Sequence, residues 1–405
     1  MASNAVVQKI VIVSQHYAPD PSTTATYLAA IAEGLATDYQ VLVISGTARS
    51  ASPGDGKTKP CVVEVKRWMT QKHTLVRRGI AMMLFSIKVF FATLKHVSKK
   101  DLVLCVTTPF SLPYPVTLAT KLRNASAILL IYDLYPEALI VAGLARPDSS
   151  IIRAFRIANE IMFRALDAIV TIGRDAEALL LTYKNVTRQK IRFVPNWALL
   201  PIGYREVSTD NSFRSGSAEK LVVGLSGNIG FTHDPGTVYE AARLLKDDRN
   251  IHFLLSGWGS GWGRLTELHA KAPLKNVTLV ERVPESHLEE FLSAADLWII
   301  PYRRSVAGVS VPSRIYSLLA IGRPVIVAAD AHSEAAMILK ENDIGWVTRP
   351  EDPFELAKAI RSAAGNREET LAKGHRAAKA AERYTYDRAI ASYRQIVSEL
   401  MHGRS

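Results

Sequence analysis

The sequence predicts an α/β protein built from two doubly wound, Rossmann-like domains, and three observations support this prediction. At 405 residues the chain is too long for one ordinary hydrophobic core. Short runs that are almost wholly apolar alternate with helical segments, an order that indicates parallel sheets covered on both faces. A polar stretch with Gly and Ser at residues 201–219 interrupts the alternation and is typical of a linker.

The first domain is expected over residues 1–200. Its first strand, residues 9–15, leads into a loop with Ser22 and Thr23 as N-cap candidates and an Ala-rich helix that should end at Gly34. Further strands are predicted at residues 40–45, 61–65, 102–107, 127–131, 168–172 and 191–194. Helices are predicted between them at residues 111–123, 150–166 and 174–183, with one long helix before residue 102.

The second domain is expected over residues 220–383. The same alternation predicts strands at residues 221–225, 251–256, 277–280, 296–300 and 325–327. The predicted helices are residues 235–246, 260–271, 285–294 and about 312–320, with more helices from Pro353 onward. Two such domains in tandem place a ligand in the cleft between them, at the carboxyl ends of the strands.

Composition narrows the class of protein. An apolar content of 48% with 22% charged residues excludes a disordered chain. Two cysteines, Cys61 and Cys105, exclude a disulfide framework and fit a reducing compartment. Because the chain has no run of 18 apolar residues and its N-terminus lacks a signal-peptide core, we expect a cytoplasmic protein.

Positive charge is concentrated in one segment of the first half. Residues 57–100 hold 11 basic residues and one acid, Glu64, so this segment carries 11 − 1 = +10 of the formal net charge of +12. Such a local excess indicates an anionic partner. Nucleic acid is disfavoured because no nucleic-acid-binding module surrounds these charges.

The basic segment also has an amphipathic pattern over residues 66–100. Apolar residues recur at helical spacing, and aromatic residues widen this surface: Ile80, Met83, Leu84, Ile87, Phe91 and Leu94, with Trp68, Phe85 and Phe90. A helix buried beside its sheet would explain the apolar stripe but not the basic flanks. A basic amphipathic helix on an anionic membrane surface explains both, so we favour a peripheral protein on the inner face of the plasma membrane.

Residues 301–327 predict an anion site in the second half. A buried strand ends near Pro301, a basic loop follows, and a short helix should run from about Pro312 to Ala320 before Gly322. Backbone N–H groups and the positive end of the helix dipole would face that loop. Arg303, Arg304 and Arg314 add fixed positive charge, and a diphosphate is the ligand this arrangement suits.

Three further loops follow strands of the second half. Gly227 and Gly230 lie in a strand-to-helix turn, where glycine lets a backbone approach a phosphate, and His233 lies just beyond; a ligand-free turn and a surface histidine are the alternatives. Gly257 and Gly259 form a similar turn. Residues 282–284 end another strand, where backbone groups could hydrogen-bond a planar base, although an ordinary strand end fits equally well.

In the first half, Asp133 and Glu137 follow the strand at residues 127–131, and His16 follows the first strand. At the carboxyl ends of strands these side chains are candidates for acid–base or orienting work, the alternative being acids at a helix N-terminus. No H-E-x-x-H, C-x-x-C, D-x-D or Walker A motif is present, so the expected chemistry needs neither metal nor cofactor.

The second half resembles the donor-binding domain of GT-B-fold, family 4 glycosyltransferases, in the branch of fucosamine- and colanic-acid-type transferases that build bacterial surface polysaccharides. The similar residues are 226–230, 256–259, 281–284, 294–297, 311–316, 322–324 and Glu334. The first half is more loosely similar, at residues 17–19, 133–137, 165–169 and 194–197. The order and spacing of these motifs, rather than any one of them, carry the resemblance.

The resemblance implies the GT-B fold, with a nucleotide-sugar donor on the second domain, a lipid-linked acceptor on the first and retention of anomeric configuration. It also implies that the base lies near Val283 and that a last helix, residues 384–405, crosses back to the first domain. Two departures are present: Val309 and Ser317 replace a pair of glutamates, and Asn228 and His233 stand where Arg and Lys often bind phosphate.

We therefore expect a metal-independent, retaining hexosyltransferase that uses a nucleotide diphosphate sugar, with UDP favoured, and a lipid-linked or polysaccharide-precursor acceptor. The alternatives are a nucleotide-sugar 2-epimerase of the same fold and a non-catalytic, membrane-associated partner of a glycosyltransferase. The expected catalytic residues are Asp133, Glu137 and His16. The expected donor-binding residues are Gly227, Asn228, Gly230, His233, Gly257, Val283, Arg303, Arg304, Ser310, Val311, Pro312, Ser313, Arg314 and Ser317.

Overall fold

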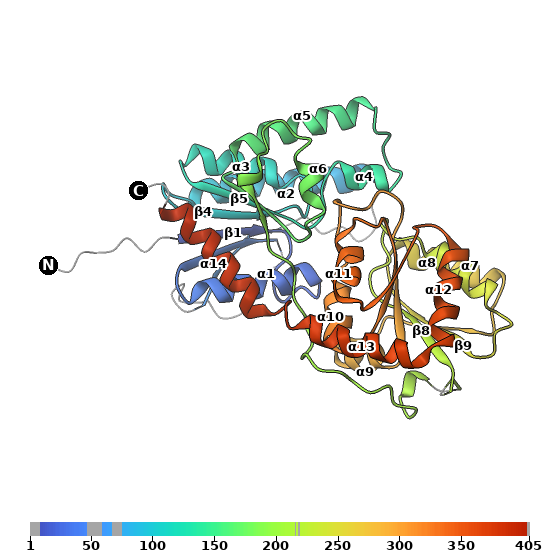
Figure 1. The fold of residues 1–405 in the computed structure, drawn as a ribbon. Coiled ribbons are helices and arrows are strands. Elements are labelled where there is room, and N and C mark those ends of the chain that lie inside the picture. The colour runs from blue at the N-terminus through green and yellow to red at the C-terminus, as the bar shows by residue number, and fades with distance from the viewer. Residues whose placement is uncertain (1–8, 47–58, 67–74, 215, 218, 403–405) are drawn as a thin grey trace. The chain divides into compact units, whose positions relative to one another are not determined.

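The computed structural model describes residues 9–46, 59–66, 75–214, 216–217 and 219–402, with side chains of the second helix described from Ile80 onward. It divides into two compact units (Figure 1). Unit 1 comprises Met1–Pro136, Pro147–Pro195 and Asp387–Ser405, and unit 2 comprises Glu137–Arg146 and Asn196–Tyr386. The predicted pair of doubly wound α/β domains is confirmed.

Unit 1 contains a seven-stranded parallel sheet in the order β3-β2-β1-β4-β5-β6-β7. The strands are β1 Lys9–Ser14, β2 Gln40–Ser45, β3 Cys61–Glu64, β4 Leu102–Val106, β5 Ser126–Ile131, β6 Ala168–Thr171 and β7 Ile191–Phe193. Ile12 pairs with Val43 on one side and with Leu104 on the other, so strand order reverses at β1 and β4. In a doubly wound sheet such a reversal opens a crevice at the carboxyl ends of the two strands.

The helices of unit 1 cover both faces of this sheet (Figure 1). They are α1 Thr23–Ala36, α2 Leu75–His96, α3 Pro113–Leu122, α5 Ser150–Ala165, α6 Ala176–Leu180 and α14 Tyr386–His402. The Ser22 hydroxyl caps α1 by accepting from the Ala25 amide, as its sequence predicts. On one face, Phe85 and Val89 of α2 and Val116 of α3 pack with alternate residues of β1 and β4.

Gly34 does not end α1, which continues to Ala36. A Cβ atom on Gly34 would lie 2.8 Å from a methyl group of Ile390, so glycine is needed here for the close approach of α14. Arg394 of α14 donates to the Gly34 carbonyl oxygen at 3.0 Å and forms an ion pair with Asp38 at 2.8 Å. The last helix is thereby part of unit 1.

Unit 2 contains a six-stranded parallel sheet in the order β10-β9-β8-β11-β12-β13. The strands are β8 Leu221–Leu225, β9 Ile251–Ser256, β10 Val277–Val280, β11 Leu297–Pro301, β12 Val325–Ala328 and β13 Gly345–Thr348. Its helices are α4 Glu137–Val141, α7 Pro235–Leu244, α8 Ser260–Lys271, α9 Leu288–Ser293, α10 Arg314–Ala320, α11 Glu334–Asn342, α12 Pro353–Gly365 and α13 Arg367–Ala381. Here strand order reverses at β8 and β11.

The polar segment 201–219 packs against unit 2. Gly203 and Arg205 donate backbone hydrogen bonds to the carbonyl oxygens of Ala320 and Ile321, at 2.8 and 3.1 Å. The side chain of Arg214 is 2% exposed and forms an ion pair with Asp296 at 2.9 Å. The described residues of this segment, 201–214, 216–217 and 219, therefore include a connection that is held along the surface of unit 2.

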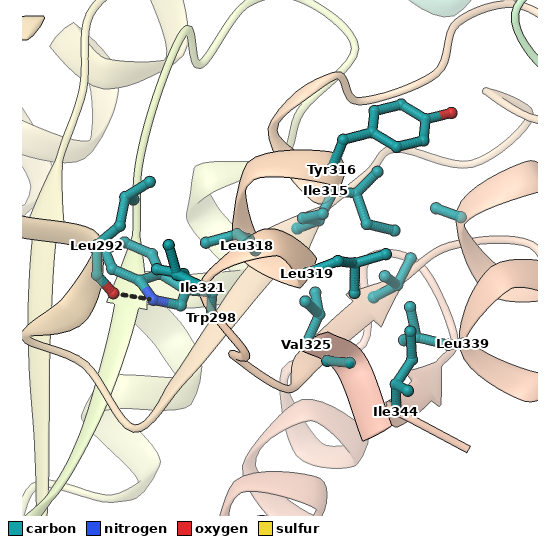
Figure 2. Close-up of a cluster of buried hydrophobic side chains, with 14 of the residues drawn as sticks. Leu292, Trp298, Ile315, Tyr316, Leu318, Leu319, Ile321, Val325, Leu339 and Ile344 are labelled. Carbon is teal, nitrogen blue, oxygen red and sulfur yellow. Dashed lines mark hydrogen bonds between the residues drawn. The ribbon is translucent and has the colours of Figure 1, made fainter. Parts of the chain in front are cut away.

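The helix α10 stands on the larger core of unit 2 (Figure 2). Every residue from Ile315 to Ala320 is buried, because the helix lies between β11, β12 and the helices α11 and α13. Trp298 of β11 lies in the same cluster and donates its indole N–H to the Leu292 carbonyl oxygen at 3.0 Å. This packing fixes the position of the loop that precedes α10.

Replacing Gly224 by Ala should destabilise the protein, because the added Cβ would lie 2.5 Å from the ring of the fully buried Trp298. We expect the free energy of unfolding to fall by about 1–3 kcal/mol. Gly263→Ala is the matched control, since nothing lies within 4 Å of its Cβ position on α8 and Ala favours a helix. Urea unfolding followed by tryptophan fluorescence checks both; equal midpoints for the two variants would contradict the packing.

Candidate functional site

Two loops at the carboxyl edge of the second sheet are bonded to each other through their backbones. The first, residues 226–230, follows β8, and the second, residues 256–259, follows β9. The Ile229 amide donates to the Trp258 carbonyl oxygen at 2.8 Å, and the Trp258 amide donates to the Gly227 carbonyl oxygen at 3.2 Å. These bonds give the first loop a fixed shape although it is outside the sheet.

The glycines of the second loop make this contact possible. A Cβ atom on Gly257 would lie 2.9 Å from the Gly227 carbonyl oxygen, and one on Gly259 would lie 2.5 Å from Oδ1 of Asn228. Gly259 also has φ +95°, which favours glycine. The Gly261 amide, in the first turn of α8, donates to the Ile229 carbonyl oxygen at 2.8 Å. Gly257 therefore has a packing role in holding the first loop, besides its predicted role at the donor.

Arg314, the first residue of α10, lies against the first loop. Its Nε and Nη2 atoms are 3.4 Å from the Cβ position that would be built on Gly227, whose φ is +112°. A side chain at residue 227 would be strained and would press on the guanidinium. The structure thus brings Gly227 and Arg314 together beside β8 and β11, where the strand order reverses, which is the usual place for a ligand in a doubly wound sheet.

The other two predicted arginines have different surroundings. The side chain of Arg304 is 71% exposed and forms an ion pair with Glu351 at 3.2 Å. Arg303 donates through Nε to the His233 carbonyl oxygen at 3.2 Å and through its amide to the Thr232 carbonyl oxygen at 2.9 Å. Among these three arginines, Arg314 is the one whose guanidinium lies at the glycine loop.

His233 is placed as a neutral hydrogen-bonding group. Its ring lies 5.2 Å from the ring of the buried Tyr302, and its Nδ1 lies 3.1 Å from the Thr232 hydroxyl. Burial lowers the pKa of His233 to about 4, so the imidazole is uncharged near pH 7. It can hydrogen-bond a phosphate there but adds no positive charge. Thr232 and Tyr302, which hold it, carry no signal in the sequence that would have identified them.

Helix α10 begins two residues later than expected, at Arg314 rather than Pro312. Ser313 has helical backbone angles and makes no side-chain cap. The amides of Ile315 and Tyr316 donate to the carbonyl oxygens of Pro312 and Ser313, at 3.0 and 3.3 Å, so the start of the helix is tightened and these two donors are already used.

The other residues predicted to bind the donor differ in how exposed they are. Ser310, Val311, Pro312 and Ser313 are partly exposed ahead of α10, whereas Ser317 is buried, and Gly230 follows Ile229 in the first loop. Val283 is partly buried against the larger core, and the neighbouring Arg282 places its guanidinium 4.4 Å from the ring of Trp258. A base beside Val283 stays a prediction.

The predicted acceptor-side residues occupy the carboxyl edge of the first sheet. His16 follows β1 and bonds Asp20 through Nδ1 at 2.8 Å. Burial raises the pKa of the Asp20 carboxyl, but hydrogen bonds from His16 and Ser22 outweigh it and leave that pKa lowered. Asp133 follows β5, and its amide lies 3.4 Å from the hydroxyl of Thr107, the residue that follows β4.

Glu137 belongs to a different unit from His16 and Asp133. It opens α4, is 7% exposed and belongs to unit 2, whereas His16 and Asp133 belong to unit 1.

Within the described ranges, no group of three or more His, Cys, Asp or Glu side chains could hold a metal ion. None of the described helices is both long enough and apolar enough to cross a bilayer.

Comparison with known proteins identifies the class. The model of the family described as "Glycosyl transferases group 1" matches residues 221–366, and that of the "Glycosyl transferase 4-like domain" matches residues 22–197. The two matches lie on either side of residues 198–220, and together they cover parts of both units. The chain belongs to the GT-B-fold glycosyltransferases of family 4.

Individual relatives agree with this family. The chain is 27% identical over 303 residues to a probable glycosyltransferase, WbjE, of Pseudomonas aeruginosa, covering 72% of this chain and 73% of the relative. It is 23% identical over 378 residues to WcaI, a putative colanic acid biosynthesis glycosyl transferase of Escherichia coli, covering 88% and 92%. Among solved structures, Anabaena HepE in complex with UDP and glucose shares the fold with a TM-score of 0.71 at 15% identity, over 97% of this chain and 100% of that chain.

The lowered pKa of His233 predicts a pH dependence of stability. Its folded pKa is about 4 and its unfolded value 6.5, so the unfolded chain holds the extra proton between these values. Stability from the neutral imidazole is complete above pH 6.5 and is lost as pH falls toward 4, by at most about 1.4 kcal/mol per pH unit.

His233→Asn, which keeps a donor toward Thr232, should flatten this slope. Unfolding free energies measured from pH 7 to pH 4.5 check it, and the comparison with the unmodified chain removes the contribution of His252, whose pKa burial also lowers to about 4. Identical slopes in the two proteins would show that folding does not lower the pKa of His233.

Proposed function

We propose that the protein is a retaining glycosyltransferase that moves a hexosyl unit from a nucleotide diphosphate sugar, with UDP favoured, to a lipid-linked or polysaccharide-precursor acceptor. The donor binds unit 2, at the reversal point beside β8 and β11. The observation that carries the proposal is the placement of the Arg314 guanidinium against Gly227. A fixed cation there lies beside a loop whose glycine lets a phosphate come close to the backbone.

A diphosphate suits these two residues chemically. The planar guanidinium donates paired hydrogen bonds to phosphate oxygens, and two unit charges 4 Å apart attract by about 4 kcal/mol at the effective dielectric of a partly exposed site. As the glycosidic bond of the donor breaks, negative charge grows on the leaving diphosphate. A cation already in position stabilises that charge without reorganisation, and no metal takes part in the proposed mechanism.

The acceptor side rests on residues at the carboxyl edge of the first sheet. His16 and Asp133 follow β1 and β5 and flank Thr107 after β4, so they border the reversal point of that sheet. We assign Asp133 or His16 to orient or deprotonate the attacking hydroxyl, with Glu137 as the third candidate. The His16–Asp20 pair favours a fixed imidazole orientation, which general-base work requires.

Relatives support the substrate class. WcaI is named for colanic acid biosynthesis and is similar in sequence over 88% of this chain. HepE was solved with UDP and glucose and shares its fold over 97% of this chain. A surface-polysaccharide precursor carried on a lipid would place the acceptor at the inner face of the plasma membrane, so the enzyme would act there as a peripheral protein.

The long basic helix fits a membrane location in part. In α2, Phe85 and Val89 face the sheet, which the buried-helix interpretation predicted. Met83, Ile87 and Phe91 are 58%, 47% and 62% exposed, which that interpretation does not explain. Trp68 and Lys72 of the predicted membrane segment lie outside the described residues.

Arg314→Gln should weaken UDP binding about 10- to 100-fold, because a charge-assisted contact to phosphate contributes roughly 1.5–3 kcal/mol. Binding of uridine, which has no phosphate, should change little. Arg304→Gln is the control, since this exposed arginine is paired with Glu351 instead. Isothermal titration calorimetry checks both, and equal UDP affinity for all three proteins would remove Arg314 from the donor site.

Transfer itself is tested with a panel of UDP- and GDP-sugars on detergent-solubilised lipid acceptors, with the anomer of the product read by NMR. We expect one hexose to be transferred with retention, and transfer to persist in EDTA. Interconversion of the donor without transfer would support the epimerase instead. Membrane binding without any nucleotide binding would support the non-catalytic partner.

Asp133→Asn and His16→Asn separate the two acceptor-side assignments. Replacing the residue that acts on the acceptor should lower kcat by about 100-fold or more, because general-base catalysis contributes about that factor. The same replacement should leave the calorimetric affinity for UDP unchanged. Glu137→Gln is measured alongside. A loss of UDP affinity in the variant that loses kcat would indicate structural damage rather than lost catalysis.

A further inference from the structure

We infer that α2, α3 and α5 of unit 1 together form one surface for an anionic lipid bilayer, to which α5 contributes cations and apolar side chains that the sequence pattern did not single out. This inference deepens the membrane location in the proposed function and rests on it for biological meaning. The residues of this surface, however, all belong to unit 1, and none of them is among the residues proposed to bind the donor.

Exposed apolar side chains are concentrated on these three helices. Of the 19 exposed large apolar residues in the described part of the chain, 10 lie on them. They are Ile80, Met83, Leu84, Ile87 and Phe91 on α2, Leu118 and Leu122 on α3, and Ile151, Ile157 and Ile161 on α5. Their exposed fractions run from 40% to 68%. Such a gathering marks an interaction surface, whereas scattered single residues would not.

The three helices form one layer. They pack side by side, α2 on α3 and α3 on α5, and Figure 1 shows α3 and α5 next to each other in unit 1. The hydroxyls of Ser86 and Ser111 lie 2.9 Å apart, linking α2 to the start of α3, and Tyr114 of α3 bonds Asn159 of α5 at 2.8 Å.

The inner sides of these helices cover the same face of the sheet. Val11, Val13 and Cys105 pack with α2 and α3, and the corresponding residues of β5 and β6 pack with Met162 and Phe163 of α5. With their inner sides occupied by the sheet, the outer sides of the three helices all face away from it in one direction.

The charges on this surface identify the partner. Within the described parts of the three helices, Lys88, Lys95, Arg153, Arg156 and Arg164 accompany the apolar residues. Lys121 pairs with Asp167 at 2.9 Å. Glu160, the one acid within these helices, is turned toward the backbone amides of Lys184 and Asn185, at 2.8 and 3.2 Å. The outward charge is therefore positive.

Anionic lipid meets both properties, since arginine and lysine stems cover apolar surface while their heads reach phosphate groups. On α5, Arg153, Arg156 and Arg164 alternate with Ile151, Ile157 and Ile161 on the exposed side, as in a helix lying in the interface plane. A second copy of the chain fits less well. A two-fold dimer would place the same basic patches against each other.

The test is sedimentation with phosphatidylcholine vesicles, with and without phosphatidylglycerol, in the absence of donor and acceptor. The full chain should bind the anionic vesicles and release them at high salt. Ile151→Ser, Ile157→Ser and Ile161→Ser together should lower binding at least about tenfold. Arg153→Gln, Arg156→Gln and Arg164→Gln together should lower it roughly a hundredfold at low salt.

Matched controls come from unit 2. Phe354→Ser with Leu371→Ser removes apolar side chains that are 71% and 50% exposed, and Arg264→Gln, Lys271→Gln and Lys275→Gln remove three exposed cations. Both control proteins should bind vesicles like the unmodified chain. Circular dichroism and UDP titration confirm that the α5 variants are folded.

Unchanged vesicle binding by the two α5 variants would overturn the inference. It would also be overturned by a dimer, seen in sedimentation velocity without lipid, that the α5 variants convert to monomers. Failure of the proposed function looks different: a chain that binds vesicles through α5 but binds no nucleotide keeps the surface and loses the transferase. A chain that binds UDP but no vesicles does the reverse.

Discussion

The backbone bonds between the loops after β8 and β9 are the constraint on which the proposed donor site depends. A loop that ends a strand loses the support of the sheet, and its amides and carbonyls need other partners. Here the two loops provide hydrogen-bond partners for each other: the Ile229 amide donates to the Trp258 carbonyl oxygen, and the Trp258 amide donates to the Gly227 carbonyl oxygen. The glycines at residues 257 and 259 leave the space that these bonds require. A rigid first loop then gives Arg314 a fixed surface to lie against, so the cation is held before any ligand arrives.

The positive charge at the loop after β8 comes from one helix, α10. His233 is uncharged, Arg304 is paired with Glu351, and Arg303 is bonded to the backbone that carries His233. Positive charge at the glycine loop therefore comes from α10, whose own position is set by six consecutive buried residues and by Trp298 beneath them. In this chain, the uncharged residues Val309 and Ser317 occupy positions where the resemblance to the family led us to look for acids.

The fold could be predicted from the sequence because its strands are short, continuous apolar runs at regular intervals. The alternation of strands and helices does not show, however, which residues far apart in the sequence lie close together in the fold. Gly34 looked like a helix end, yet Ile390, far away in the chain, explains it. The edge strand β13 was missed because Gly345–Thr348 is only four residues long. The helix α11 was missed although Ser333 caps it. At the candidate donor site, the sequence named three arginines, but which of them meets Gly227 depends on the packing of α10. On α5, isoleucines occur on both sides of the helix, so periodicity alone could not separate those that face the sheet from those that face outward.

The return of the chain to unit 1 has a consequence for synthesis on the ribosome. Helix α14 buries Ile390, Tyr393, Ile396 and Val397 within unit 1, each to 5% exposure or less. Burial of side chains of this size stabilises a fold by about 1.5–3 kcal/mol apiece. Domains generally fold as they emerge, amino-terminal one first. Here unit 1 begins to emerge before most of unit 2 but lacks one of its helices until residues 387–402 are translated, whereas unit 2 emerges with all of its elements before then. The unit whose first strand is made earlier is thus completed after the other.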